Sequence, residues 1–246
     1  MKILVCIDDT DNLESRGTGD LATELAEELE NRGWGRSSFV TRHQLLVHPD
    51  VPYTSHNSSM CFEAEIDPAY LEALISYAGD YLERESAVGS DPGLCVTVLE
   101  RLAEPEAMVA FGRSAKEAVL NKKMAYDLAE KIGVHLSEHG GTGQGVIGAL
   151  AGIGLRMSGK DGRMKGWLHI RTDNGLARVG DILSQVGLRG VRTMDGEALG
   201  REEIIAVDEK PKAVMIDGAP YLMVSPVDKG DGVRWRTTPR QQLKRF

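Results

Sequence analysis

Near its start the chain reads Ile3-Leu4-Val5-Cys6-Ile7-Asp8-Asp9-Thr10-Asp11-Asn12, five apolar residues followed by three carboxylates within four positions. The apolar run predicts a buried strand, so the acids would lie at its C-terminal end, where α/β sheets gather their ligands. Like charges repel, and such a cluster is expected to be neutralised by a cation or by hydrogen-bond donors. Mg²⁺ is the natural candidate because it binds oxygen ligands together with phosphates. The alternative is a solvated turn in which Asp8 or Asp11 only caps the backbone.

The composition bounds the class of protein. The chain has 246 residues, of which 41% are hydrophobic and 27% charged, enough for a large core and for one or two domains. No apolar run approaches the length of a membrane span, and the first one stops at Asp8, too early for a signal peptide. A cytoplasmic protein with no membrane partner is therefore expected. The net charge of −8 argues against a broad nucleic-acid surface and leaves a local basic face open.

The three cysteines indicate free thiols. Their number is odd, no Cys-x-x-Cys pair occurs, and Cys6 and Cys95 lie inside apolar runs. Buried thiols are therefore expected in place of a disulfide or a zinc site.

A helix is expected directly after the acids, over about residues 18–32, because leucine recurs every fourth position from Leu21 to Leu29. The loop between the first strand and this helix would contain Gly17-Thr18-Gly19. These residues would place backbone N–H groups at the helix N-terminus, which suits a phosphate. A flexible glycine turn explains the same residues equally well.

The remaining pattern predicts an α/β protein with a mixed α+β sheet and flanking helices, followed by a smaller C-terminal α+β part. Strands are expected at residues 38–47, 60–66, 94–99, 167–170, 204–207, 213–216 and 221–224. Helices are expected from Asp67-Pro68 onward and at residues 104–111, 114–132 and 178–186. Asp217-Gly218 is typical of a hairpin turn. Ser158 to Gly162 reads as a linker, which would divide the chain into domains 1–157 and 163–246.

A second glycine-rich stretch, His139-Gly140-Gly141-Thr142-Gly143-Gln144-Gly145, leads into a helix of small apolar residues. Glycines let a backbone approach a phosphate closely, and a helix N-terminus adds partial positive charge. The stretch is neither a P-loop nor a dinucleotide fingerprint, because the lysine and the strand spacing of those motifs are missing. The alternative is tight packing of a glycine-lined helix on the sheet. That alternative can hold for Gly148, Gly152 and Gly154 even if Gly140 to Gly145 bind a ligand.

Two regions carry polar residues that suit an acceptor or a polyanion. Arg42 and His43 interrupt the apolar pattern of the second strand, and His56 and Asn57 lie in the loop that follows. They are candidates for binding an acceptor or for stabilising the charge of a transition state, although a lone histidine is more often structural. The C-terminal tail is basic, with aromatic residues interspersed, and it would either touch phosphates or be a solvated end. Its basic residues are Arg234, Arg236, Arg240, Lys244 and Arg245.

Four motifs occur in a characteristic order: Ile7-Asp8-Asp9-Thr10-Asp11, the loop from Pro52 to Asn57, Asp91-Pro92-Gly93, and the run of glycines and small residues from Gly141 to Ala151. Together, over about residues 1–156, they resemble the kinase-like catalytic domain of the archaeal tRNA-Ile agmatinylcytidine synthetases, TiaS. In that family ATP and Mg²⁺ are used to phosphorylate the 2-carbonyl oxygen of an anticodon cytosine, and agmatine then displaces the phosphate. The resemblance implies that the three acids hold metal and phosphates and that loop 140–145 encloses the nucleotide.

The chain departs from the family at two points. Where the family carries Gly-Asn-Gly, this chain reads His56-Asn57-Ser58-Ser59, so only Asn57 matches. Cysteines for the family's zinc ribbon are missing from this sequence. Both departures favour a stand-alone relative that modifies a different acceptor.

The main hypothesis is therefore an ATP- and Mg²⁺-dependent phosphotransferase or kinase-like ligase acting on an unidentified small-molecule or RNA acceptor. The alternatives are an RNA (tRNA) cytidine-modifying enzyme and a nucleotide-binding module without catalysis. A homodimer is left open. The catalytic and metal-binding candidates are Asp8, Asp9 and Asp11. The nucleotide-binding candidates are Thr10, Gly17, Thr18, Gly19, Gly140, Gly141, Thr142, Gly143 and Gly145. The acceptor-binding candidates are Arg42, His43, His56, Asn57 and Asp91.

Overall fold

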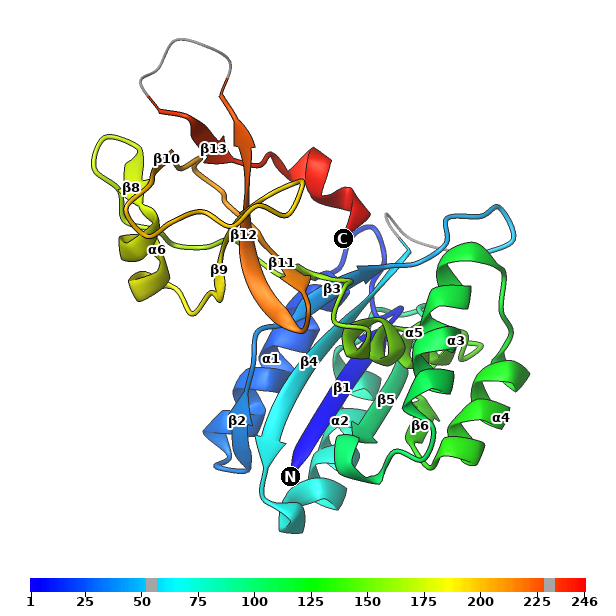
Figure 1. Cartoon of the computed structure of the whole chain (residues 1–246). Helices are drawn as coiled ribbons and strands as arrows, with labels where there is room; N and C mark the ends of the chain where they lie inside the picture. The colour runs from blue at the N-terminus through cyan, green and yellow to red at the C-terminus, as the bar shows by residue number, and fades with distance from the viewer. Residues whose placement is uncertain (52–56, 228–232) are drawn as a thin grey trace. The chain divides into compact units, whose positions relative to one another are not determined.

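The computed structural model describes residues 1–51, 57–227 and 233–246, and the chain forms two compact units, Met1–Ser158 and Gly159–Phe246. His56 lies outside the described residues. Both units mix helices with strands, as Figure 1 shows, and the expected α+β class is confirmed. Within the described ranges, no helix is both long and apolar enough to cross a membrane.

Unit 1 is built on an antiparallel sheet whose strand order is β6-β5-β1-β4-β3, with β2 also paired to β4. The strands are β1 (Lys2–Asp8), β2 (Gly35–Ser37), β3 (Thr41–Gln44), β4 (Ser58–Ile66), β5 (Gly93–Val98) and β6 (His135–Glu138). The helices are α1 (Thr18–Asn31), α2 (Leu71–Glu85), α3 (Pro105–Glu117), α4 (Lys122–Ile132) and α5 (Gly145–Met157). Short 3₁₀ turns occupy Pro68–Tyr70 and Leu99–Arg101.

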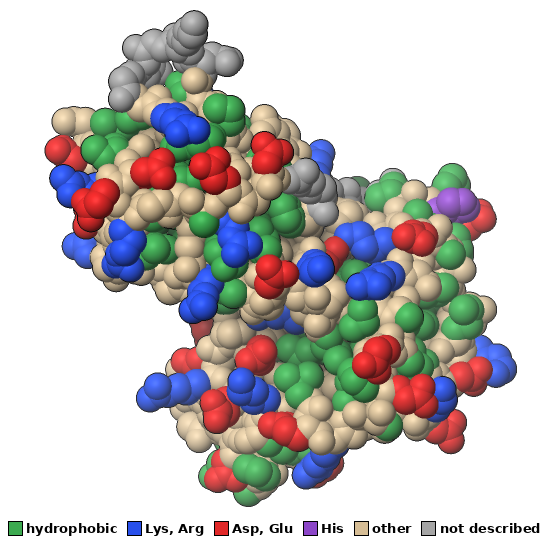
Figure 2. Space-filling view, in the orientation of Figure 1, with side chains coloured by type: hydrophobic (Ala, Val, Ile, Leu, Met, Phe, Trp, Pro, Cys, Tyr) green, Lys and Arg blue, Asp and Glu red, His purple; other side chains and the backbone are tan. Residues whose placement is uncertain are grey.

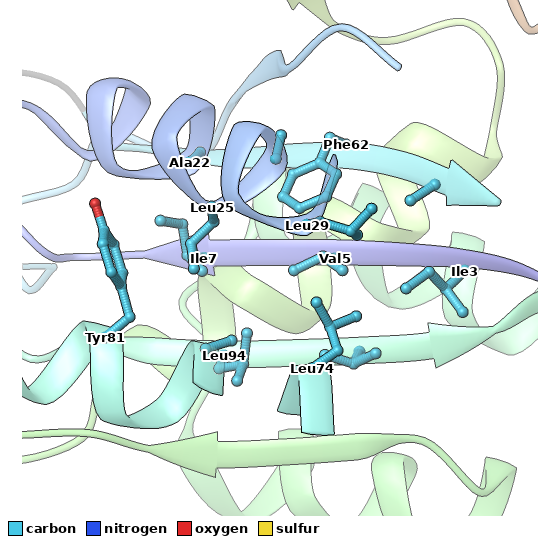
Figure 3. Packing of buried hydrophobic residues seen from close by; sticks show 14 of the residues in the cluster. Ile3, Val5, Ile7, Ala22, Leu25, Leu29, Phe62, Leu74, Tyr81 and Leu94 are labelled. Atoms are coloured by element: carbon cyan, nitrogen blue, oxygen red, sulfur yellow. The ribbon is translucent and has the colours of Figure 1, made fainter. Parts of the chain in front are cut away.

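The first strand lies at the centre of this sheet and is buried on both faces, which explains why its apolar run is continuous. Ile3, Val5 and Ile7 pack against α1 and α2 in one cluster, as Figure 3 shows. Leu4 and Cys6 point to the other face, where α3, α4 and α5 pack. Each fully buried aliphatic side chain contributes about 1.5–3 kcal/mol. The unit is therefore a sheet between two helical layers.

The cysteines behave as expected. Cys6, Cys61 and Cys95 are free and buried. Burial raises the pKa of the Cys95 thiol to about 12, so this thiol stays protonated at neutral pH.

Several expected elements need correction. The helix expected at residues 114–132 is wrong, because the chain breaks between α3 and α4, where the Asn121 side chain accepts a hydrogen bond from the Met124 N–H (3.0 Å) and caps the new helix. The strand expected at 38–47 is reduced to β3. Residues 167–170 form no strand, although the Leu168 N–H donates to the Pro211 carbonyl (2.8 Å).

Unit 2 contains a second set of strands in the order β7-β11-β12-β13-β10-β8, with β9 also paired to β12. The strands are β7 (Arg163–Met164), β8 (Leu176–Arg178), β9 (Gly190–Thr193), β10 (Ile204–Ala206), β11 (Ala213–Ile216), β12 (Ala219–Pro226) and β13 (Trp235–Thr237). Helix α6 (Val179–Gln185) and a 3₁₀ turn at Arg240–Arg245 complete the unit.

The hairpin turn and the basic tail of unit 2 can now be placed. Asp217 and Gly218 both have positive φ (50° and 75°) and join β11 to β12, as the dipeptide predicts. The tail is not a solvated end, because Trp235 forms β13 and Leu243 is buried. Its basic residues are partly engaged within the unit, since Arg236 donates to the Asp208 carboxylate (2.8 Å).

Candidate functional site

The acids of the first loop lie where three chain segments meet. Asp8 is the last residue of β1 and pairs with Gly93, the first residue of β5. Gly93 in turn pairs with Glu138, the last residue of β6, and the glycine-rich loop follows directly. Because these strands are antiparallel, the end of β1, the beginning of β5 and the end of β6 share one edge of the sheet. This edge therefore collects Asp8 to Asp11, Asp91 and loop 139–145.

Asp91 holds the glycine-rich loop in place. The Thr142 Oγ1 hydroxyl donates to Asp91 Oδ2 (2.7 Å), and the Thr142 N–H donates to Asp91 Oδ1. The backbone of the same segment adds two bonds, from the Gly145 N–H to the Asp91 carbonyl (3.0 Å) and from the His139 N–H to the Pro92 carbonyl (2.8 Å). In this structure Asp91, predicted to bind an acceptor, braces the loop predicted to bind the nucleotide.

Asp8 is the most buried of the acids, with 8% of its surface exposed. Its carboxylate packs against the first turn of α5, so close that a Cβ on Gly148 would lie 1.7 Å from Asp8 Oδ2. Burial raises the pKa of Asp8 well above its ordinary value, and the charges of Asp9 and Asp11 raise it further. A cation at this position would therefore relieve an unfavourable buried charge.

Asp9 is held in an unusual backbone conformation. Its φ of 53° is left-handed, which costs a non-glycine residue about 1–2 kcal/mol. Burial, followed by the charges of Asp91 and Asp11, raises the pKa of Asp9 to about 6, while a hydrogen bond from the Asp91 backbone acts in the opposite direction. Four carboxylates therefore concentrate negative potential at this edge of the sheet.

Three hydroxyl groups of unit 1, those of Thr10, Ser59 and Ser86, are buried without a hydrogen-bond partner in the part of the chain that the structure describes. Of these residues, Thr10 is 1% exposed and Ser59 is 0% exposed. A buried hydroxyl without a partner costs about 1–3 kcal/mol, so each one calls for an explanation. Thr10 lies between Asp9 and Asp11, where a bound ligand would supply the missing bond.

The N-terminus of α1 faces the same acids. Among the residues that the structure describes, no side-chain hydrogen bond caps this helix, and its Ncap residue Gly17 has an extended backbone. A Cβ on Gly17 would lie 3.6 Å from Asp11 Oδ2, so Asp11 lies beside the start of the helix. Thr18 and Gly19 are buried in the first turn. An uncapped helix start next to a candidate cation site suits a phosphate.

The glycines of the second loop are required by the structure for different reasons. Gly140, Gly141 and Gly143 have positive φ, which other residues adopt at a cost. Gly145 does not, and a Cβ there would lie 2.2 Å from the Asp91 carbonyl oxygen. Its N–H is already bonded, so the structure explains Gly145 by the close packing of α5 on β5.

Lys122 and Glu138 clamp the outer side of this loop, and sequence patterns alone did not pair them. Lys122 Nζ donates to Glu138 Oε1 (3.0 Å) and to the Thr142 carbonyl (2.6 Å). The Tyr126 hydroxyl donates to the same carboxylate (2.8 Å). Because these residues come from α4 and β6, only the folded chain brings them to the loop.

Of the predicted acceptor residues, Arg42 and His43 lie on β3 and Asn57 lies directly before β4. His43 is fully buried, and its Nε2 lies 2.7 Å from Thr41 Oγ1, which accepts a bond from Arg156 Nη1 (3.0 Å). Arg42 Nε donates to Ser58 Oγ (2.9 Å), and Asn57 Nδ2 donates to the Leu46 carbonyl (2.6 Å). In this structure all three residues brace the strand pair, and His43 does so inside the core.

No three His, Cys, Asp or Glu side chains within the described ranges already converge as a metal-binding group.

Replacing Asp91 with asparagine is expected to lower the pKa of Asp9 from about 6, because Asp91 is the largest charge acting on it. The pKa can be followed by NMR titration of the carboxyl carbons. The asparagine side chain keeps one oxygen for Thr142, whereas Asp91→Ala removes both bonds and should speed amide exchange at Thr142. An unchanged Asp9 pKa in Asp91→Asn would show that burial and Asp11, without the Asp91 charge, cause the shift.

Comparison with known proteins supports the resemblance seen in the motifs. No model of a protein family matches the chain. An uncharacterised protein of Methanocaldococcus jannaschii is 28% identical over 156 residues, which are 63% of this chain and 50% of that protein. The chain thus spans about half the length of this curated relative.

Solved structures of TiaS resemble this chain in sequence and fold. Apo TiaS, an agmatidine synthetase for an isoleucine tRNA, is 25% identical with a TM-score of 0.53 and is matched over 63% of this chain and 35% of its own. The complex of TiaS with its tRNA and ATP is 26% identical with a TM-score of 0.55, over 63% of this chain and 36% of its own. A tRNA fluorescent labeling enzyme shares the fold at 24% identity and a TM-score of 0.56, over 73% of this chain and 40% of that one. The resemblance to TiaS is confirmed, and this chain is similar to TiaS in both sequence and fold over 63% of its length.

Proposed function

We propose that the chain is an ATP-dependent enzyme that modifies an RNA of the tRNA type, and that unit 1 binds the ATP together with Mg²⁺. The observation that carries this proposal is the meeting of Asp8, Asp9, Asp11 and Asp91 with loop 139–145 at one edge of the sheet. Negative side chains supply cation ligands, while the loop and the start of α1 supply backbone donors.

The residues of this edge fit an ATP–Mg²⁺ complex. Burial and neighbouring negative charges raise the pKa of Asp8 and of Asp9, and a bound cation would offset this destabilisation of their ionised forms. Mg²⁺ usually takes one or two carboxylates plus phosphate oxygens and water, so a preformed group of three protein ligands is not required. The unpartnered Thr10 hydroxyl would gain a bond from a phosphate or a water. When bound, ATP would supply an electrophilic phosphoryl group and Mg²⁺ would neutralise its charge.

The three acids of the first loop are suited to different tasks. Asp8, buried against α5, would ionise to hold the cation. Asp9, which lies between Asp8 and Asp91 in the charge cluster, would share the cation or orient the acceptor group. Asp11, beside Gly17, would hold the cation close to the N-terminus of α1.

The comparisons favour an RNA acceptor over the unidentified acceptor of the main sequence-based hypothesis. TiaS has been solved with its isoleucine tRNA and ATP, and also with that tRNA, AMPCPP and agmatine. We extend this use of ATP and tRNA to the present chain as part of the proposal.

The first test is a thermal-shift titration with nucleotides. ATP with Mg²⁺ should raise the melting temperature, because a ligand present at 100 times its Kd stabilises by about 2.7 kcal/mol. ATP with EDTA should have little effect. The second test is ATP turnover with and without bulk tRNA at near-physiological salt.

The outcomes distinguish three functions. Turnover that requires tRNA supports the proposal. Turnover with small molecules and no RNA would restore the phosphotransferase hypothesis, and ATP binding without turnover on any acceptor would indicate a nucleotide-binding module.

A further inference from the structure

Residues 167–171 of unit 2 follow a bend at Lys165 and Gly166, where Gly166 has a positive φ (78°), and their side chains alternate between the unit's core and its surface. Leu168 is buried, and Met164 and Ile170 pack against the unit's core. The residues between them point outward, and Trp167 is 49% exposed. The outward residues are Lys165, Trp167, His169 and Arg171. Residues 167–170, predicted as a strand, form none, although their side chains alternate between buried and exposed.

The exposed indole is flanked by a cation and an imidazole. Lys210 Nζ lies 5.1 Å from the centre of the Trp167 ring. The ring of His169 meets Trp167 edge to face, with centroids 6.5 Å apart. The Lys212 ammonium donates to the Gly166 carbonyl, so the backbone next to the indole is fixed. The tryptophan is thus held in a defined position at the surface.

The far end of the segment is fixed as well. The Arg171 N–H donates to Gln185 Oε1 (2.8 Å), and Gln185 Nε2 donates to the Arg171 carbonyl (3.3 Å). The Leu168 N–H bonds to the Pro211 carbonyl, next to Lys210 and Lys212. Hydrogen bonds therefore fix the backbone of this segment to α6 and to residues 210–212, so its exposed side chains extend from an ordered backbone.

An exposed tryptophan among basic side chains needs a reason. A surface cation–π pair contributes only about 0.5–1 kcal/mol. The chain carries a net charge of −8, and the face drawn in Figure 2 shows basic and acidic side chains interspersed, so a row of basic residues around one indole is a local feature. Cations alternating with an exposed ring match a polyanion whose bases are free to stack, which is single-stranded nucleic acid. A duplex keeps its bases stacked inside and would not use the indole.

We propose that Lys165, Trp167, His169, Arg171 and Lys210 form a binding stripe for single-stranded RNA, with a base stacked on Trp167 and phosphates near the basic side chains. This inference rests on the proposed function, because it assumes that the chain acts on RNA. It deepens that function by assigning RNA contact to an element of unit 2 other than the basic tail. The recognition is by stacking and charge, so it tolerates different sequences.

The test measures binding of a labelled 12-nucleotide oligouridine and of a 12-base-pair RNA duplex by fluorescence anisotropy, without ATP, between 50 and 200 mM salt. Trp167→Ala should weaken binding of the single strand about tenfold, within the range measured for stacked bases, and Trp167→Phe should keep most of the affinity. Lys210→Ala should weaken binding and reduce the salt slope by about 0.7. Arg189→Ala removes an exposed arginine elsewhere in unit 2 and should leave binding unchanged.

Three results would overturn the proposal: parental affinity in Trp167→Ala, equal losses in Arg189→Ala and Lys210→Ala, or a duplex bound as tightly as the single strand. Melting temperatures show whether each variant is folded, and Trp167→Phe and Lys210→Ala carry the test if Trp167→Ala is unstable. Because ATP is absent from this assay, a failure here is separate from a failure of ATP binding in unit 1, which the thermal-shift titration reports.

Discussion

Asp8→Asn is expected to abolish Mg²⁺-dependent ATP binding and, at the same time, to raise the melting temperature of the ligand-free protein at pH 7. The carboxyl group is buried against α5, and burial and the charges of Asp9 and Asp11 all disfavour its ionised form. Asparagine keeps the shape and removes the charge that must be buried. Each kcal/mol gained raises the melting temperature by roughly 2–4 °C in a chain of this size.

The stability gained in Asp8→Asn should depend on pH in a defined direction. The pKa of Asp8 is raised in the folded state, so between the unfolded and folded values the native protein binds more protons than the unfolded one. The stability that Asp8 contributes is therefore full below its unfolded pKa of about 4 and is lost as the pH rises through the folded value. The advantage of Asp8→Asn should accordingly be small at pH 4 and grow towards pH 8.

The matched control is Asp80→Asn, which removes an exposed carboxylate from α2 of the same unit. It should change neither ATP binding nor the pH profile of the melting temperature. An Asp8→Asn variant that melts below the parent at every pH would mean that the carboxylate is structural, and one that still binds ATP with Mg²⁺ would remove Asp8 from the proposed site.

Gly148→Ala is expected to lower ATP affinity by about tenfold or more and to destabilise the fold by about 1–3 kcal/mol, the usual cost of overpacking. The new Cβ would lie 1.7 Å from Asp8 Oδ2 and 3.0 Å from Leu45 Cδ1. The Asp8 carboxyl would have to leave its place against α5. Alanine is the better helix former by about 1 kcal/mol, so any loss of stability is due to this collision.

A double-mutant cycle isolates the collision. In an Asp8→Ala background the carboxyl group is gone, and adding Gly148→Ala should then cost little or stabilise the protein. Urea unfolding of the four proteins measures the difference. An equal loss in both backgrounds would assign the clash to Leu45 or to the backbone.

Local sequence signals were sufficient for much of unit 1 and for one turn of unit 2. The apolar run before Asp8 predicted β1, because a strand buried on both faces needs no alternation. The leucine spacing predicted α1, and Asp217-Gly218 predicted the turn between β11 and β12. Each of these signals acts between residues close in the chain, where propensity and periodicity are decisive.

The candidate site was only partly visible in the sequence. The acids and the glycines could be named, and the resemblance to TiaS grouped them. That Asp91 braces Thr142, that Gly148 makes room for Asp8, and that His43 is buried with Thr41 and Arg156 all depend on contacts between distant segments. A glycine that approaches a ligand and a glycine that approaches a helix look the same in a sequence.

By itself, then, the sequence determined that a buried strand ends in acidic residues and is followed by a helix. It also determined that a glycine-rich loop leads into a second helix of small apolar residues. The tertiary structure decided that the strands pair antiparallel, which brings the end of β1, the beginning of β5 and the end of β6 to one edge. It also decided that residues 167–170 form no strand and that Trp167 is exposed to solvent. The physical reason is that strand pairing and burial are set by the packing of residues far apart in the chain, whereas propensity and periodicity report only on neighbours.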